Sequence, residues 1–245
     1  MVVARKKKGV SRRFSSLVSL VLPARMPSSL VADDDADVAR SCARRAVELA
    51  LASRIHSPVV GFDTETTGLR GAVVQAALVE LDGEGVETDV FVGLVHPPAG
   101  YVMEEGAVRT HGITSDRLRA EAQPAAPFFA ELVRRIKRAR ERGVPVVAHN
   151  AAFDVARLNE TLDKHGMASS RLERGDVFCT MQPAKRPCGL VNRLGRPKAP
   201  SNAEMYAALF AGADASECGP LHDAASDARA TARSYVEARR RGWWG

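Results

Sequence analysis

Aromatic side chains are scarce in this chain, where they make up only 5% of the 245 residues. Hydrophobic residues of all kinds reach 45%, which is enough for a globular core, so that core must rely on Val, Leu, Ile and Ala. No apolar run reaches the roughly 18 residues that a membrane-spanning helix needs. The sequence therefore predicts one domain of ordinary to large size, with a tail, and no membrane contact.

Paired cysteines are also lacking. There is no Cys-x-x-Cys pair, and no set of Cys and His has the spacing of a zinc site. Isolated thiols are typical of a reducing, intracellular compartment. The cysteines are Cys42, Cys179, Cys188 and Cys218.

Acidic residues are missing from residues 1–32, which are rich in Lys, Arg and Ser. Such a segment resembles an organellar transit peptide, and its Arg5–Lys8 cluster equally resembles a nuclear localisation signal or a nucleic-acid-binding arm. We expect residues 1–32 to be disordered. Acidic residues then open residues 33–55, where the apolar spacing predicts an amphipathic helix.

A second stretch without acidic residues covers residues 177–203, where Lys and Arg lie among prolines and glycines. We interpret it as a long basic loop whose plainest use is contact with phosphates. The formal net charge of +6 is likewise consistent with a nucleic-acid partner. The basic face of the helix expected over 124–143 is interpreted as a solvated surface.

The order of elements predicts an α/β domain with a mixed sheet. Three strands with short links form an antiparallel meander, and helices alternate with strands after it. Either Thr114 or Ser115 caps a short helix. The expected strands begin at Val59 and cover 72–81, 90–95, 144–148 and 177–180, and the longer helices cover 124–143, about 153–167, 202–210 and 223–241.

The first strand ends in Asp63-Thr64-Glu65-Thr66-Thr67-Gly68-Leu69. Because residues i and i+2 of a strand point to the same face, Asp63 and Glu65 present two carboxylates side by side. Two close anions repel each other unless a proton or a cation lies between them. A hard divalent cation prefers such oxygen ligands, whereas the simpler alternative is a pair of solvated carboxylates.

Two further carboxylates follow strands where an α/β sheet normally places functional groups. Asp154 lies near the start of the helix after the fourth strand, and Asp227 lies one turn into the last helix. His222 and Asp227 would face different sides of a continuous helix, so we expect His222 in the loop before it. A histidine there can take a proton from a metal-bound water.

These motifs together resemble those of the DEDDh, or DnaQ-like, 3′–5′ exonucleases, to which the proofreading epsilon subunit of bacterial replicative polymerase is related. Asp63-Thr64-Glu65 resembles the first family motif, and His149-Asn150 with Phe153-Asp154 resembles the second. His222, four intervening residues and Asp227 resemble the third, and His111-Gly112-Ile113-Thr114 matches a segment between the first two.

The resemblance implies an RNase H-like fold with a five-stranded mixed sheet and helices on both sides, over residues 56–242. It implies that Asp63, Glu65, Asp154 and Asp227 bind two Mg²⁺ or Mn²⁺ ions and that His222 is the general base. It also implies that the terminal nucleotide contacts a pocket that includes Thr66 and Leu69, which Asn150 and Phe153 would line as well. Core packing is the alternative for Leu69 and Phe153, and His111 and His149 are expected to be structural.

The implied function is hydrolysis of single-stranded DNA from its 3′ end to nucleoside monophosphates. An enzyme that trims RNA 3′ ends would have the same site, so RNA stays open as substrate. A non-catalytic nucleic-acid-binding module is the alternative from another class, which loss of a metal ligand would have favoured. A polymerase partner and the oligomeric state are left open by the sequence.

Overall fold

The computed structural model describes residues 40–41, 43–45 and 57–244. The chain divides into two compact units, Met1–Ala46 and Val47–Gly245. In the first unit the five described residues are helical. The basic segment 1–32 and most of the helix expected over 33–55 lie outside the described residues. Within the described part, no helix has the length and apolar character needed to cross a membrane.

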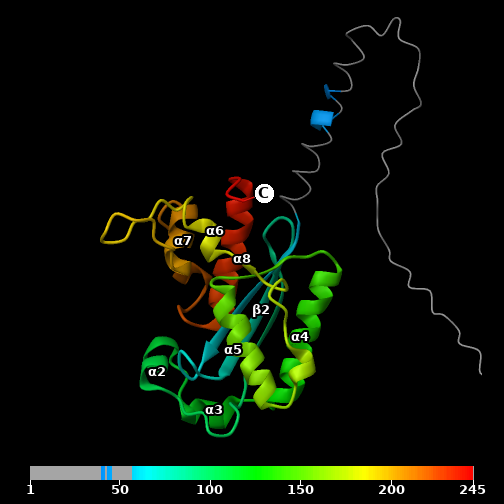
Figure 1. The fold of residues 1–245 in the computed structure, drawn as a ribbon, viewed down its shortest axis with the longest axis vertical. Helices are drawn as coiled ribbons and strands as arrows, with labels where there is room; N and C mark the ends of the chain where they lie inside the picture. Colours follow the sequence, from blue (N-terminus) through cyan, green and yellow to red (C-terminus); the bar gives the residue numbers. More distant parts are fainter. Residues whose placement is uncertain (1–39, 42, 46–56, 245) are drawn as a thin grey trace, which may run out of the picture. The chain divides into compact units, whose positions relative to one another are not determined.

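The second unit contains a five-stranded mixed sheet with the strand order β3-β2-β1-β4-β5 (Figure 1). The first three strands form the expected antiparallel meander, and β4 and β5 continue the sheet in parallel on the other side of β1. The predicted mixed α/β sheet is confirmed. The strands are β1 (Val59–Thr66), β2 (Val73–Leu81), β3 (Glu87–Leu94), β4 (Val146–Ala148) and β5 (Phe178–Cys179).

The third strand begins three residues before the expected start at Val90. Its first residues, Glu87 to Asp89, are polar and exposed, because β3 lies at the edge of the sheet. They pair with β2 through their backbone, with Asp89 opposite Glu80. Because these residues bury no side chain, they lack the alternation of apolar and polar residues that predicts a strand.

All eight helices and strands expected with bounds after β1 lie within a few residues of their predicted positions, as does the short helix after Thr114. Two helices were not expected. The first, α2, buries none of its residues and so shows no apolar face, and the second, α6, is a single turn inside the supposed basic loop. The helices are α2 (Glu105–His111), α3 (Ser115–Glu121), α4 (Ala125–Glu141), α5 (Ala151–Lys164), α6 (Met181–Ala184), α7 (Asn202–Leu209) and α8 (Ala224–Arg240).

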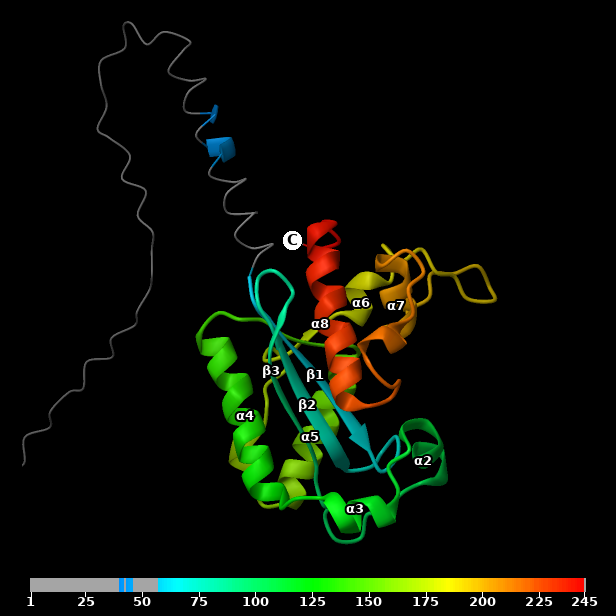
Figure 2. The same ribbon diagram turned by 180° about the vertical axis from the view of Figure 1, so that it is seen from behind.

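Helices cover both faces of the sheet (Figure 1 and Figure 2). On one face α4 and α5 pack against β1 in a core that includes Phe62, Leu132 and Leu158. On the other face α8 packs against a second core that includes Val59 and Ala77. Since successive side chains of β1 alternate between these layers, odd-numbered residues of β1 face α8 and even-numbered residues face α5.

Helix α8 lies unusually close to β1. A Cβ atom added to Gly61 would lie 2.1 Å from the carbonyl oxygen of Ala228 and 3.1 Å from the Cβ of Ala232. Ala224, Ala228 and Ala232 recur every four residues and form the buried stripe that faces the sheet. Small side chains on both sides therefore bring the first turns of α8 next to the end of β1.

Candidate active site

Two carboxylates leave the end of β1 on the face that α8 covers. Asp63 and Glu65 are separated by two positions, and both are partly buried. The pairing with β2 shifts register between Glu65 and Thr66, where regular strand structure ends. The Thr66 hydroxyl then donates a hydrogen bond to the carbonyl oxygen of Gly68 at 2.8 Å, which closes the turn after the strand. The side-by-side arrangement expected from the sequence is therefore present.

Asp154 reaches the same strand from the opposite layer. Its helix, α5, begins directly after β4, which pairs with β1 only at Val60 and Gly61. Beyond that pairing the first turn of α5 lies beside β1, and the Thr64 hydroxyl donates to Asp154 Oδ1 at 2.8 Å. Asp154 is only 3% exposed. The short β4 thus lets a carboxylate from the α5 layer approach the two on β1.

The start of α8 is bonded to the sheet by a buried glutamine. Gln75 lies on β2 directly opposite Glu65. Its side-chain Nε2 donates to Asp223 Oδ2 at 2.9 Å, and its Oε1 accepts from the backbone N–H of Ala224 at 3.1 Å. Asp223 is also the N-cap of α8 and accepts from the N–H groups of Ala225 and Ser226. These bonds fix the first turn of α8 beside Glu65.

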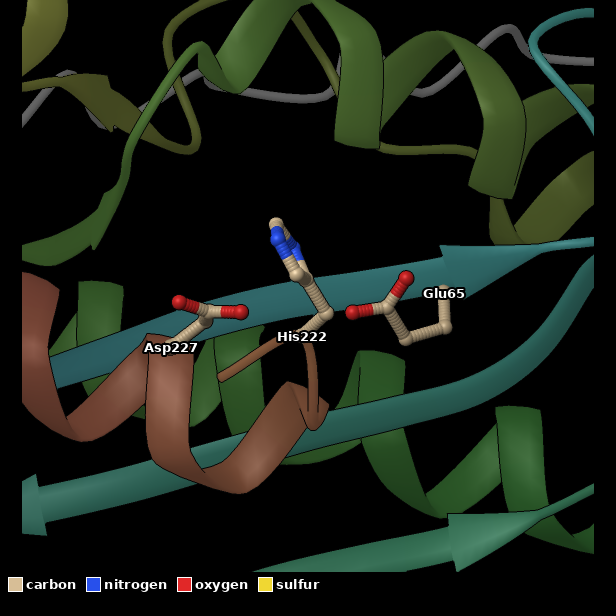
Figure 3. Close-up of side chains that lie close together, drawn as sticks. All are labelled: Glu65, His222 and Asp227. Carbon is tan, nitrogen blue, oxygen red and sulfur yellow. The ribbon is translucent and has the colours of Figure 1, made fainter. Parts of the chain in front are cut away.

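His222 and Asp227 flank this fixed turn. His222 lies in the loop before α8, as expected, with a left-handed backbone (φ 57°) and an exposed side chain. A ring nitrogen of His222 and carboxylate oxygens of Glu65 and Asp227 all lie within 4.8 Å of one another (Figure 3). Asn202 of α7 donates through Nδ2 to the backbone oxygen of Asp227 at 3.1 Å and to its Oδ1 at 3.3 Å. Loop, helix and neighbouring α7 thus place one histidine and one carboxylate over Glu65.

The four carboxylates hold protons more tightly than ordinary carboxyls do. Burial raises the pKa of Glu65 to about 8, with repulsion from Asp227 and Asp154 adding to it. Burial also raises the pKa of Asp154 to about 7, against the opposing hydrogen bond from Thr64. The pKa of Asp63 is raised by burial and then by repulsion from Asp154 and Asp227. Burial likewise raises the pKa of Asp227, although the Asn202 hydrogen bond opposes it.

This chemistry fits divalent cations. Within the described residues, no Lys or Arg forms an ion pair with any of the four carboxylates, so no such cation offsets their mutual repulsion. Oxygen ligands of this kind suit hard cations such as Mg²⁺ or Mn²⁺. A positive charge would relieve the repulsion that raises each pKa. The site is therefore an acidic cluster suited to divalent metal.

A pocket of about 410 Å³ opens beside Glu65. Thr66, Leu69 and Phe153, all expected to contact substrate, are among its lining residues. Leu69 is 82% exposed, which excludes the core-packing alternative for that residue. Asn150 is not part of the lining. It is the exposed N-cap of α5 with φ 73°, and its carbonyl oxygen accepts from the N–H of Phe153 at 2.8 Å, so its contribution in this structure is to the helix start.

The other two motif histidines bond to the backbone. His111 Nε2 lies 3.1 Å from the carbonyl oxygen of Thr66, and its Nδ1 accepts from the N–H of Ile113 at 3.0 Å. His149 Nε2 lies 2.9 Å from the carbonyl oxygen of Pro200, and its Nδ1 lies 3.0 Å from the Thr180 hydroxyl. Both ring nitrogens of each residue are engaged, which agrees with the structural roles expected for them.

Sequence reasoning missed the residues that hold the site together. Gln75 gave no signal, because its partner Asp223 is 148 positions away. Asn202 could have been found, since the Ser201-x-x-Glu204 capping box marks the start of α7 next to it. Gly61 inside a strand is itself a signal for close backbone approach.

Comparison with known proteins gives one family and several related structures. The family model RNase_T, described as Exonuclease, matches residues 60–235. The PolC-type DNA polymerase III of Lactococcus lactis subsp. lactis (strain IL1403) is 32% identical over 114 residues, which are 45% of this chain and 6% of that protein.

Among solved structures, exonuclease I of E. coli in complex with a 5cy-dT13 oligonucleotide is 22% identical with a TM-score of 0.55, over 76% of this chain and 41% of that one. Exonuclease I from Methylocaldum szegediense is 21% identical with a TM-score of 0.54, over 76% of this chain and 41% of that one. This chain thus corresponds to less than half the length of these relatives, and the likeness to the solved structures confirms the predicted RNase H-like fold.

Proposed function

The chain belongs to the exonuclease family whose model matches residues 60–235, and we propose that it hydrolyses single-stranded DNA from the 3′ end to nucleoside monophosphates. The observation that carries this proposal is the convergence of four carboxylates, none with a Lys or Arg partner among the described residues, and one exposed histidine beside a pocket of about 410 Å³. Loss of a metal ligand would have favoured a non-catalytic binding module, whereas the mutual repulsion among Asp63, Asp154 and Asp227 and the grouping of Glu65, His222 and Asp227 support the catalytic proposal.

Asp63, Glu65, Asp154 and Asp227 would hold two Mg²⁺ or Mn²⁺ ions. When bound, two such ions supply Lewis acids that activate a water and stabilise the leaving 3′-oxygen of a phosphodiester. Thr64 orients the Asp154 carboxylate, and Asn202 orients that of Asp227. In this proposal the protein's own contribution is to hold four anions at fixed positions against their repulsion.

His222 is the proposed general base. Its ring nitrogen lies within 4.8 Å of carboxylate oxygens of Glu65 and Asp227, so it can reach a water held between those groups. Because the side chain is exposed, a proton taken from the attacking water can pass directly to solvent. The Gln75–Asp223 bonds keep the loop that carries His222 next to the sheet.

The pocket beside Glu65 is the proposed site of the terminal nucleotide. Its volume of about 410 Å³ lies in the range of small-ligand pockets. Leu69 and Phe153 offer apolar surface for the base, and Thr66 and Thr110 lie among its polar lining residues. Pocket and carboxylates share Glu65, so a nucleotide seated there would place its 5′-phosphate at the acidic cluster.

Incubation of 3′-labelled and 5′-labelled single strands with Mg²⁺ tests the proposal. We expect immediate release of labelled mononucleotide from the 3′ end, stepwise shortening of the 5′-labelled strand, and no activity in Asp63→Ala. Matched DNA and RNA strands decide between a deoxyribonuclease and an RNA-trimming enzyme. If neither strand is shortened while both bind, the non-catalytic module is the better description.

The likeness to a stretch of a PolC-type DNA polymerase supports a polymerase as a further partner of this chain. An enzyme that proofreads would remove mispaired 3′ ends faster in the presence of its polymerase. Co-purification with a replicative polymerase, together with faster removal of a mismatched end, would support the association. Equal rates with and without polymerase would oppose it.

A further inference from the structure

Residues 177–203, expected to be an irregular basic loop, contain a hairpin that is built by its own contacts. The N–H of Lys198 donates to the carbonyl oxygen of Leu190, and that of Asn192 donates to the carbonyl oxygen of Arg196, both at 2.8 Å. Val191 and Pro197 form an antiparallel bridge between these pairs. We call residues 190–198 the basic hairpin. It extends away from α7 in both Figure 1 and Figure 2.

The tip of the basic hairpin is ordered by one side chain. Asn192 Oδ1 accepts from the N–H of Leu194 at 2.9 Å and from that of Arg196 at 3.1 Å. Gly195 has φ 69°, the left-handed geometry that a short hairpin turn with a bulge requires. The tip therefore presents Arg193, Leu194 and Arg196 from a defined turn.

The basic hairpin carries cations that nothing in the described part of the chain neutralises. Arg193 and Arg196 are exposed, and neither forms an ion pair among the described residues, whereas Lys198 pairs with Glu204. Leu194 is 77% exposed at the same tip. Unpaired guanidinium groups beside an exposed apolar side chain suit phosphates next to unstacked bases, as a single strand presents them.

The root of the basic hairpin is attached to the active site at two points. His149 lies two residues before the start of α5, the helix that carries Asp154, and its ring contacts the Thr180 hydroxyl and the Pro200 carbonyl. Thr180 and Pro200 are the two ends of the segment that contains the hairpin. The carbonyl of Pro200 can only accept, so Nε2 of His149 carries a proton and donates it to that oxygen. Burial lowers the pKa of His149, which favours the neutral ring.

The second attachment of the hairpin root is at Asn202, two residues after Pro200. Its side chain donates hydrogen bonds to Asp227 of the acidic cluster. The ring of His149 and the amide of Asn202 therefore connect the hairpin root to the two helices that carry Asp154 and Asp227. A nucleic-acid strand bound by the hairpin would therefore have a fixed position relative to those carboxylates.

We propose that the basic hairpin is a contact arm for the phosphate backbone of the nucleic-acid strand, upstream of the 3′ end that enters the site. The proposal rests on the proposed function for the identity of the strand. Arg193 and Arg196 bind successive phosphates, and Leu194 contacts a base between them. The contact is independent of sequence, because it involves phosphates and one apolar surface.

The test compares Arg193→Ala/Arg196→Ala with wild type on a dinucleotide and on a strand of about 30 nucleotides, long enough to span a single-strand binding channel. For the long strand we expect KM to rise by about tenfold with kcat unchanged. For the dinucleotide we expect no change, since it does not reach the hairpin. Asn192→Ala, which releases the tip, should raise KM for the long strand in the same direction by a smaller factor.

Salt dependence gives a second measurement. Each lost phosphate contact on a single strand lowers the slope of log K against log salt by about 0.7, so the double variant should lose about 1.4. Equilibrium binding of a fluorescent strand without Mg²⁺ measures this slope in the absence of turnover. Because this binding measurement does not depend on hydrolysis, it can show failure of the contact arm separately from failure of the proposed function.

Arg138→Ala/Arg142→Ala is the matched control. It removes the same charge from exposed positions of α4 and its end, which lie around a hollow with Val59 and Val60 at the start of β1, away from Asp63 and Glu65. We expect this control to leave KM and the salt slope near wild type. An unchanged KM and slope in the hairpin variant, or an equal effect of the control, would overturn the proposal.

Discussion

The side-chain amide of Gln75 joins β2 to the first turn of α8 through the carboxylate of Asp223, with 2.9 Å between Nε2 and Oδ2. Gln75 is only 4% exposed, and it lies opposite Glu65 in the sheet. Because Asp223 also caps α8, one buried contact determines where both His222 and Asp227 stand relative to β1. The geometry of the acidic cluster thus depends on Gln75, a residue with no proposed part in the reaction.

Gln75→Glu places a carboxylate against Asp223 and removes the donor of this contact. We expect kcat to fall by about 10- to 100-fold, the usual cost of disturbing a residue that orients metal ligands. KM for a long strand should change little, because the pocket and the basic hairpin are untouched. Gln75→Met, similar in size and uncharged, separates loss of the hydrogen bonds from the added repulsion. Wild-type kcat in both variants would show that the contact does not position the site.

Asp63→Asn should stabilise the metal-free protein while it abolishes hydrolysis. The substitution removes one of four repelling carboxylates, and burial already disfavours the charged form of Asp63. A shift of one pKa unit corresponds to about 1.4 kcal/mol. We therefore expect the Tm of the metal-free protein to rise by about 2–4 °C.

The same variant should lose most of the rise in Tm that Mg²⁺ or Mn²⁺ gives to wild type. Thermal unfolding with chelator and with added metal measures both effects. Asp82→Asn is a control, since Asp82 lies in the turn after β2 and makes only local contacts. A lower Tm for metal-free Asp63→Asn would contradict the account of repulsion in the cluster.

Stability of the metal-free protein should fall as pH rises from about 5 to about 8. Glu65 and Asp154 have ordinary pKa values of 4.5 and 3.8, which folding raises to about 8 and about 7. The folded chain therefore holds these protons more tightly, and the resulting stabilisation is complete below about pH 4 and lost as pH passes 7 and 8.

Bound metal should flatten that profile, because a cation replaces the protons. Tm measured at each pH, with chelator and with Mg²⁺, gives the two curves, and the gap between them should widen toward alkaline pH. Asp154→Asn should show a shallower decline without metal. A metal-free Tm that rises between pH 5 and 8 would mean that the carboxylates are not protonated in the folded chain.

The sequence predicted the clustered carboxylates better than the residues that hold them in place, for a physical reason. The two-residue period of a strand places Asp63 beside Glu65 without further information. Joining them to Asp154 and Asp227 needed the motif resemblance, since spacing alone does not say which strand ends meet. Gln75 and Asn202 act through contacts across 148 and 25 positions, and no local pattern encodes such pairs.

The fold was likewise predicted where side chains are buried and missed where they are exposed. The strands β1, β2 and β4 bury their side chains and were readable as apolar runs. By contrast, α2 buries nothing, and the first half of β3 is polar, so both form through backbone bonding in a tertiary context that hydrophobic periodicity does not report.

Gly61→Ala tests the close packing of α8 on β1. The added Cβ would lie 2.1 Å from the carbonyl oxygen of Ala228, so the helix must move away from the strand. We expect a loss of about 1–3 kcal/mol in the free energy of unfolding, the usual cost of overpacking a core. Activity should fall as well, because Asp227 moves with the helix.

Gly175→Ala is the matched control, since a Cβ there meets no atom within 4 Å. Denaturant unfolding gives the two free energies, and rates on a long strand give the activities. Equal stability of Gly61→Ala and wild type would show that α8 can shift without cost, and that its small residues do not set the geometry of the site.

His222→Asn separates proton transfer from metal binding. A ring nitrogen of His222 lies as close to Glu65 and Asp227 as a metal ligand would, so geometry alone allows either role. As a general base, its loss should lower kcat by about 10²- to 10⁴-fold while the metal-induced rise in Tm stays near wild type. As a ligand, its loss would reduce that rise together with kcat.

His149→Asn is not an adequate control, because His149 holds the root of the basic hairpin. His96→Asn, two residues after β3, removes an exposed imidazole that is not grouped with Glu65 and Asp227, and it should leave both readouts unchanged. We expect the first outcome, because the exposed, left-handed loop position leaves the ring open to the water and solvent with which a base must exchange protons. In the proposed function the four carboxylates are the metal ligands, so no fifth ligand is needed.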